Sequence, residues 1–188
     1  MIRLLKYFIA LVTVVQSYAQ QSQPLPNVIF IIVDDLRPEL NLYGNDFIKS
    51  PNIDALAAQG ITFNRAYCNV PVCGASRASM LTGIRPTKSR FLRYYSSINE
   101  AGPNIKHIVD YFNDRGYITI SNNKITHLKN DITSWDEEWY PKDISWRNYQ
   151  DPKNRELDAN KKPASAYEKL VVKDSVYFDA QTAQKSIE

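Results

Sequence analysis

The spacing of apolar residues changes along the chain, and each spacing predicts a type of element. Asn27–Val33 is a continuous apolar run, which is typical of a strand buried on both faces of a parallel sheet. Ile61–Tyr67 alternates apolar and polar residues and predicts a second strand, and Tyr117–Ile120 predicts a short third one. Segments with helical spacing separate these three runs.

The helical segments have recognisable start and stop signals. Pro51–Gln59 is predicted to be a helix with Ser50 as its N-cap and Gly60 as a left-handed residue at its end. Its buried stripe is expected to consist of Ile53, Leu56 and Ala57. Further helices are expected from near Ser76 to Thr82, over Pro103–Arg115, and from Asp179 onward. Helices that alternate with strands predict an α/β fold, with a mostly parallel sheet covered by helices.

Two parts of the chain depart from this alternation. Leu128–Ala166 has no periodicity and mixes aromatic residues with charges and prolines, so a long irregular excursion is expected there. The last predicted helix runs to the end of the chain without a capping signal, and three strands are few for a sheet covered on both faces. Residues 27–188 are therefore expected to be the N-terminal, incomplete part of a longer domain.

The N-terminus has the pattern of an export signal. Arg3 and Lys6 precede an apolar run, and Ser17 and Ala19 are small residues at the positions that a signal peptidase recognises. Residues 1–19 are thus predicted to be a cleaved signal peptide, followed by a polar leader over residues 20–26. The alternative is a membrane anchor, but the run is well short of the ~20 residues that span a bilayer. We expect export to the periplasm or the cell exterior.

Composition and charge exclude some functions. The hydrophobic content of 44% is ordinary for a globular domain. The formal net charge is +3, and cleavage would remove Arg3 and Lys6 and leave a nearly neutral chain. Because that chain has no long basic run, nucleic acid is not expected as its main partner.

The segment Val70–Pro86 contains a cysteine in an unusual setting. Cys73 lies between small residues, at or just before a predicted helix N-terminus, where free backbone N–H groups and the helix dipole stabilise an anion. Arg77 adds a positive charge, so the place suits a sulfate or phosphate group. The thiol has three interpretations: a nucleophile, a site of modification, or half of a disulfide with Cys68, which an exported chain favours.

Charged residues also follow the predicted strands. Asp34 and Asp35 end the first strand, and their like charges favour a cation between them, such as a divalent ion held by carboxylate oxygens. A solvated turn paired with Arg37 is the alternative. Lys124 and His127 follow the third strand, at the carboxyl end where open α/β sheets bind ligands. Their alternative is an exposed lysine and a loop histidine.

These residues together resemble the N-terminal part of the sulfatase family, within the alkaline-phosphatase-like superfamily. The family signature, C-x-P/A-S-R followed by L-T-G, is present as Cys73–Arg77 and Leu81–Gly83. Within the family the chain is most similar to iduronate-2-sulfatases and their bacterial relatives. The matching segments are Asp34–Pro38, Tyr43-Gly44, Gly83–Pro86 and the Lys124-x-x-His127 spacing. One departure is Asn123, where the family usually has glycine.

The resemblance implies an alkaline-phosphatase-like fold and the hydrolysis of sulfate esters. A separate maturing enzyme would oxidise Cys73 to formylglycine, whose hydrate attacks sulfur, expels the alcohol and then releases sulfate with its second hydroxyl. Arg77 would orient the diol, Lys124 would neutralise sulfate charge, and His127 would hydrogen-bond the diol and help its proton leave. A disulfide would block this chemistry, so Cys68 is expected to be a lone buried thiol.

The resemblance also implies a metal and partners. Asp34, Asp35 and position 73 would hold one calcium ion, which polarises the diol and a sulfate oxygen. The substrate would be a sulfated carbohydrate such as a glycosaminoglycan sugar, and the formylglycine-generating enzyme would be a second partner. Two alternatives stay open: a truncated chain without catalytic competence, and a formylglycine-dependent phosphoesterase.

Overall fold

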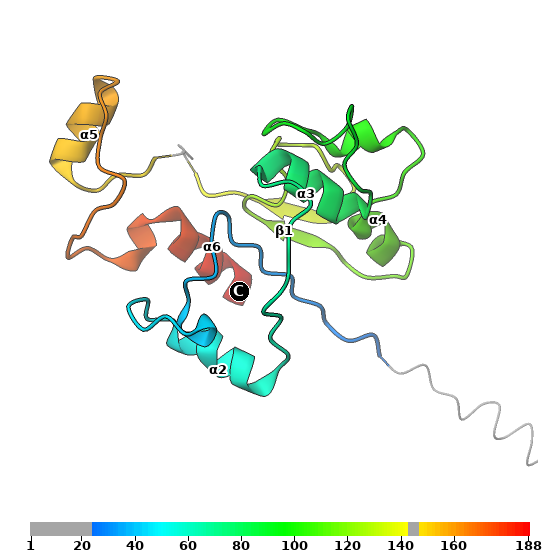
Figure 1. The fold of residues 1–188 in the computed structure, drawn as a ribbon, viewed down its shortest axis with the longest axis horizontal. Coiled ribbons are helices and arrows are strands. Elements are labelled where there is room, and N and C mark those ends of the chain that lie inside the picture. Colours follow the sequence, from blue (N-terminus) through cyan, green and yellow to red (C-terminus); the bar gives the residue numbers. More distant parts are fainter. Residues whose placement is uncertain (1–23, 143–146) are drawn as a thin grey trace, which may run out of the picture. The chain divides into compact units, whose positions relative to one another are not determined.

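The structure is a computed structural model that describes residues 24–142 and 147–188 (Figure 1). The chain divides into two units, Met1–Ile31 and Ile32–Glu188. In the first unit, the described residues 24–31 are irregular and exposed. The predicted signal peptide, the leader up to residue 23, and Trp146 of the aromatic excursion lie outside the described residues.

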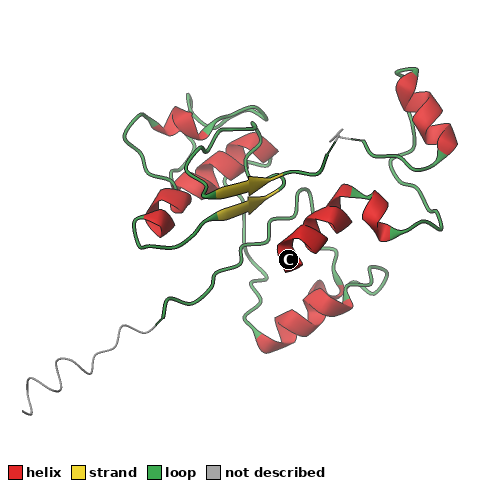
Figure 2. Cartoon of the chain, turned by 180° about the vertical axis from the view of Figure 1, so that it is seen from behind, coloured by secondary structure: helices red, strands yellow, loops and turns green. Residues whose placement is uncertain are grey.

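The second unit contains helices and one small parallel sheet. Its helices are the 3-10 helices η1 (Asn41–Tyr43), η2 (Ile98–Ala101) and η3 (Asp174–Val176), and the α-helices α2 (Pro51–Gln59), α3 (Cys73–Thr82), α4 (Ile108–Asn113), α5 (Pro152–Ala159) and α6 (Phe178–Ile187). Strands β1 (Ile120–Asn122) and β2 (Glu137–Trp139) pair in parallel, as Figure 2 shows. The α/β prediction is therefore confirmed. None of the helices in the described ranges is long and apolar enough to cross a membrane.

Helix α3 forms the centre of the buried core of this unit. Its Ala75, Ala78 and Leu81 recur at helical spacing and are at most 2% exposed. They pack in one cluster with Phe91, Ile98, Val109 and Ile132. Burial of one face of α3 fixes the position of its first turn, which begins at Cys73.

Two of the three predicted strands are wrong. Asn27–Val33 and Ile61–Tyr67 are irregular, and Ile29 and Ile61 are 85% and 83% exposed. A strand is stabilised by a hydrogen-bonded neighbour and by burial of its side chains, and within the described residues neither run belongs to a ladder. The third strand exists but is β1, which overlaps the predicted Tyr117–Ile120 at Ile120 only.

The predicted helices exist, but some differ from the prediction in their bounds or in which residues are buried. Helix α2 has the predicted bounds, but Ile53 and Leu56 of its stripe are 43% and 67% exposed, since no described element covers that face. Gly60 is extended, with φ −117°, and not left-handed as predicted. Helix α3 begins three residues earlier than Ser76. The prediction of a helix from Asp179 onward is confirmed by α6.

Helix α4 is much shorter than the predicted Pro103–Arg115. It begins at Ile108 because the backbone N–H of His107 donates to the Asp110 carboxylate, which caps the helix there. The predicted irregular excursion Leu128–Ala166 contains β2 and α5. Asp151 caps α5 by accepting hydrogen bonds from the backbone of Lys153 and Asn154, and Pro152 is at its first position.

Candidate active site

Cys73 begins α3 and faces a histidine from a distant segment. It follows extended Val72 and is half-buried. Its Sγ lies 3.3 Å from Nδ1 of His127, in the loop after β1. Both cysteines are free, so the disulfide interpretation is wrong. Cys68 is exposed and not buried as predicted, because it follows the uncovered segment Ile61–Tyr67.

Arg77, one turn after Cys73, connects three segments of the chain. Its Nη1 donates to the backbone carbonyls of Lys124 at 3.0 Å and Ile125 at 2.9 Å, and its Nη2 donates to Oδ1 of Asp34 at 2.9 Å. The residue is 5% exposed. A buried guanidinium needs such partners because an unpaired charge is costly to remove from water. Arg77 thus fixes Asp34 and the loop after β1 against the start of α3.

Asp34 is shared between two cations. Lys124 Nζ lies 2.6 Å from Oδ2, while Arg77 holds Oδ1. Partial burial acts to raise the pKa of Asp34, but the hydrogen bonds and charges of Lys124 and Arg77 together outweigh it, so the pKa lies below its ordinary value. Two cations around one carboxylate leave an excess positive charge for an anion. Arg37, the alternative partner, pairs with Glu39 instead.

His127 is held in its neutral form at neutral pH. Burial lowers its pKa, as do the charges of Lys124 and Arg77, and Asp34 opposes them only in part. Its ring contacts the ring of Tyr94 edge-on, with centroids 5.6 Å apart. A neutral imidazole facing position 73 is able to accept a proton there. Tyr94 is not identifiable from sequence, because it belongs to no motif and lies in an irregular segment.

Comparison with known proteins identifies the family. A model of the sulfatase family matches residues 26–187. The chain belongs to the sulfatase family. Human iduronate 2-sulfatase is 40% identical over 112 residues, which are 60% of this chain and 20% of the human protein. A sulfatase of Formosa agariphila is 36% identical over 119 residues, 60% of this chain and 24% of that protein. An arylsulfatase of Clostridium perfringens is 39% identical over 95 residues, 50% of this chain and 19% of that protein.

The chain spans about a fifth of the length of these curated relatives. The match confirms the predicted family and its α/β, alkaline-phosphatase-like fold class. Within it, the structure brings together five of the six predicted site residues: Asp34, Cys73, Arg77, Lys124 and His127. The sixth, Asp35, has no hydrogen bond or ion pair to any described side chain.

Asn123 departs from the sulfatase pattern without disturbing the site. Its φ of +69° is in the left-handed region, where glycine and asparagine are the least strained residues. The backbone N–H donates to the carbonyl of Trp139 at 2.7 Å, and the side-chain amide donates to Thr182 at 2.8 Å. These bonds hold the turn that precedes Lys124. Asparagine thus adopts the left-handed conformation for which the family usually has glycine.

Asp34 and Asp35, which follow Asn27–Val33, are of the type that binds calcium, but they are too few for a complete site. Carboxylate oxygens are the ligands that calcium prefers, and it takes about 6–8 of them. Asp34 already binds two cations, which leaves Asp35 as the carboxylate without a partner among the described residues. Within residues 24–142 and 147–188, no three His, Cys, Asp or Glu side chains are grouped so that they hold a metal ion. A complete calcium site therefore requires ligands from outside these ranges.

Gly74 is required by a close approach of two backbone segments. A Cβ at this position would lie 1.9 Å from the carbonyl oxygen of Tyr94. Alanine here must therefore push the Tyr94 backbone away from the start of α3. We expect Gly74→Ala to lower the free energy of unfolding by about 1–3 kcal/mol, measured by urea denaturation.

Gly60→Ala is the matched control for this prediction. A Cβ at Gly60 would meet nothing closer than a backbone oxygen at 3.4 Å, and its φ of −117° suits alanine. Its effect should stay within about 0.5 kcal/mol. Equal effects of the two substitutions would contradict the close contact at Gly74.

Proposed function

We propose that this chain belongs to an enzyme that hydrolyses sulfate esters, and that Cys73 is its reactive residue after conversion to formylglycine. The observation that supports this best is the juxtaposition at Cys73. A half-buried thiol at a helix N-terminus faces neutral His127, beside the buried Arg77 and the Asp34–Lys124 pair. These groups surround one point with hydrogen-bond donors and positive charge, which is what a transferring sulfate group needs.

The modification explains why a cysteine occupies this position. Conversion removes two electrons from Cβ, expels the sulfur as sulfide and puts an oxygen in its place, so the maturing enzyme must supply an electron acceptor. The aldehyde adds water to give two hydroxyls, one to attack sulfur and one to release sulfate. A thiol has no second hydroxyl and is not able to complete the cycle. The Cys73 side chain is half-buried and not sealed in the core, which is compatible with this conversion.

The surrounding side chains have separate roles in this proposal. His127 accepts a proton from position 73, since its lowered pKa keeps the ring neutral. Lys124 lies at the exposed side of the Asp34 carboxylate, where its ammonium group is able to pair with a sulfate oxygen. Arg77 keeps the start of α3 and the loop of Lys124 and His127 in register. A helix N-terminus adds backbone N–H donors.

Calcium is part of the proposal, with Asp34, Asp35 and position 73 as the ligands in this chain. When bound, the ion would polarise a sulfate oxygen and the oxygen on position 73. We expect Asp35→Asn to weaken calcium binding at least about tenfold in calorimetric titration. Because the Asp35 side chain has no described partner, stability without calcium should not change.

Asp46→Asn is the control for the calcium prediction. Asp46 is an exposed acidic residue nearby in the sequence, whose contact is made by its backbone carbonyl. It should leave calcium binding unchanged. Calcium affinity that is equal in wild type and Asp35→Asn would rule out Asp35 as a ligand.

A sulfated sugar is the proposed substrate. The similarity to human iduronate 2-sulfatase supports a sulfated uronic acid, as in a glycosaminoglycan. We further propose export to the periplasm or cell exterior and maturation by a formylglycine-generating enzyme. The direct test is a matched pair of substrates, 4-nitrophenyl sulfate and 4-nitrophenyl phosphate, with enzyme from the native host. Sulfate hydrolysis supports the proposal, and preference for the phosphate would overturn it in favour of a phosphoesterase.

A further inference from the structure

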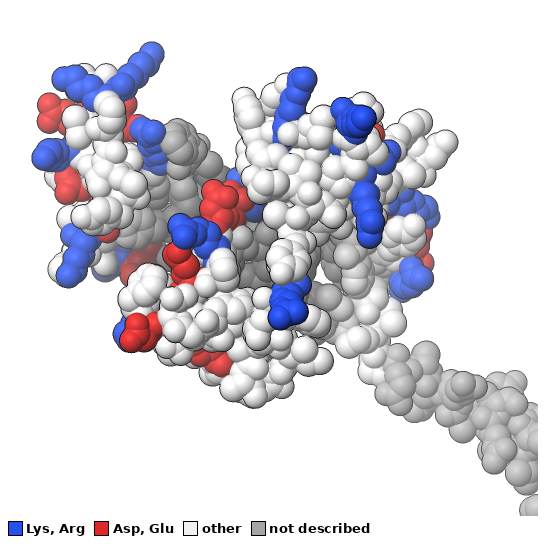
Figure 3. Space-filling view, viewed as in Figure 1, with Lys and Arg blue, Asp and Glu red and all other residues white. Residues whose placement is uncertain are grey.

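The segment between α3 and η2 concentrates positive charge that no acidic side chain of the described residues neutralises. Residues 83–97 contain no acidic residue and four basic ones, Arg85, Lys88, Arg90 and Arg93. None of the four forms an ion pair with an acidic residue in the described ranges. In Figure 3, basic side chains lie over the part of the surface where Figure 1 places this green segment. Such a surface favours an anionic ligand.

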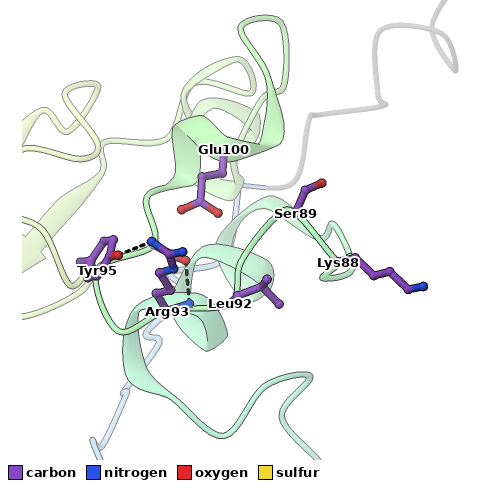
Figure 4. Close-up of a pocket in the computed structure, with 7 residues that line it drawn as sticks. Lys88, Ser89, Leu92, Arg93, Tyr95 and Glu100 are labelled. Atoms are coloured by element: carbon purple, nitrogen blue, oxygen red, sulfur yellow. Dashed lines mark hydrogen bonds between the residues drawn. The ribbon is translucent and has the colours of Figure 1, made fainter.

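A cavity of about 310 Å³ opens between this segment and η2. Its lining combines cations, hydroxyls, one apolar side chain and one carboxylate: Lys88, Ser89, Leu92, Arg93, Tyr95, Ser96 and Glu100 (Figure 4). The volume is at the small end of ligand sites. A mixture of hydroxyls, cations and an aromatic ring is suited to a sugar ring that carries an anionic group.

The guanidinium of Arg93 is oriented so that it can bind an anionic group. Its Nη1 donates to the Tyr95 hydroxyl, and its guanidinium lies 5.6 Å from the centre of the Tyr95 ring. These contacts orient the guanidinium while leaving its remaining N–H donors available. A planar guanidinium is the group that binds a carboxylate or sulfate through two parallel hydrogen bonds.

Glu100 does not cancel this positive charge. Its carboxylate accepts the backbone N–H of Phe91 at 2.6 Å and that of Ser97 at 3.4 Å, so it serves the local backbone. Lys88 and Arg93 outnumber it in the lining. The free lone pairs of the Glu100 carboxylate are able to accept hydrogen bonds from sugar hydroxyls.

Two ring contacts connect the lining of the cavity to the candidate active site. The Tyr95 ring packs edge-on against Tyr94, with centroids 5.0 Å apart, and Tyr94 packs against His127. The backbone of Tyr94 also touches the start of α3 at Gly74. Tyr94 thus contacts both His127 of the candidate site and Tyr95 of the cavity lining.

We propose that this cavity binds a second anionic group, a carboxylate or sulfate, on the substrate sugar or on the sugar next to it. The inference rests on the proposed function for the choice of ligand. It assigns Lys88 and Arg93 as specificity residues that select a charged saccharide over a small neutral sulfate ester. Both side chains are exposed, and neither belongs to the buried core.

A binding experiment tests the cavity without relying on turnover. We expect Lys88→Gln/Arg93→Gln to bind a disaccharide with one carboxylate, or one with a single sulfate, at least about tenfold more weakly than wild type does in calorimetric titration. The two ligands distinguish whether the anionic group is a carboxylate or a sulfate. A neutral disaccharide is the control ligand, and wild type should bind it no more tightly than the double variant binds the two charged disaccharides. Lys169→Gln removes an exposed lysine elsewhere and should behave as wild type. Equal affinities for wild type and the double variant would overturn the inference.

Kinetics separates this inference from the proposed function. The double variant should lose about tenfold in kcat/KM on a sulfated uronic-acid disaccharide and stay within about twofold of wild type on 4-nitrophenyl sulfate. An equal loss on both substrates would contradict a specificity role. If wild type hydrolyses neither substrate, the proposed function fails, and the binding experiment alone then decides on the cavity.

Discussion

Cys73→Ser is expected to abolish turnover of sulfate esters while leaving the fold intact. A serine hydroxyl is able to attack sulfur and expel the alcohol, but it has no second hydroxyl to release sulfate. The variant should therefore stop after one event and retain one sulfate, about 80 Da, on the peptide that contains residue 73. Because the Sγ of Cys73 contacts only His127 among the described polar groups, stability should change by about 1 kcal/mol or less.

Cys68→Ser provides the matched control in the same segment. Cys68 is exposed and free, so its replacement should leave both activity and stability as in wild type. The rates are measured with 4-nitrophenyl sulfate, and the trapped sulfate is measured by mass spectrometry. Continued turnover by Cys73→Ser would contradict a formylglycine mechanism, as would a loss of activity in Cys68→Ser alone.

Arg77→Gln is expected to damage stability and activity together. The substitution removes a buried cation that holds Asp34 and the carbonyls of Lys124 and Ile125. Breaking such a buried pair costs on the order of 3 kcal/mol of unfolding free energy. Loss of the positive charge and of the fixed loop should lower kcat/KM about 10²–10³-fold. Urea denaturation and sulfate ester hydrolysis measure the two effects.

Lys124→Gln separates the two contributions. The Lys124 side chain is 40% exposed, so its ion pair with Asp34 is screened by solvent and contributes about 1 kcal/mol or less to stability. The loss of activity in Lys124→Gln should nevertheless be of the same order as that in Arg77→Gln if both charges act on sulfate.

The stability of Arg77→Gln tests the structural role of Arg77. If this variant unfolds at the same urea concentration as wild type, Arg77 does not connect the three segments as described.

The residues of the candidate site are identifiable from sequence because each has a local signal. Cys73 lies at a helix start with Arg77 one turn later, and both positions are set by helical spacing. The sequence predicts Lys124 and His127 just after a strand, and β1 ends two residues before Lys124. The pairing of Asp34 with Arg77 and Lys124 follows from opposite charge once these segments meet.

The incorrect predictions of two strands and of the buried face of α2 have a common physical cause. Periodicity indicates which side of a segment favours burial, but not whether another segment covers it. Ile29, Leu56 and Ile61 are apolar at the predicted spacing and still exposed, because the described residues provide no cover for them. Strand β2 was missed for the opposite reason, since Glu137 and Glu138 give it no apolar alternation.

Close backbone contacts and ring contacts have no sequence signal either. The approach of the Tyr94 carbonyl to Gly74, and the packing of Tyr94 on His127, depend on how residues 83–107 fold over α3. Helix α5 did have a signal, because Asp151 followed by Pro152 is a typical helix start. It was missed within a segment whose apolar residues have no period.

The mass of residue 73 tests the central claim most directly. Trypsin releases residues 66–77 as one peptide that contains both cysteines, and iodoacetamide alkylates a thiol but not an aldehyde. In protein from the native host, we predict one alkylated residue, Cys68, and a residue 73 that is about 18 Da lighter than cysteine. Alkylation of both residues, which shows that residue 73 is still a cysteine thiol, would contradict the account.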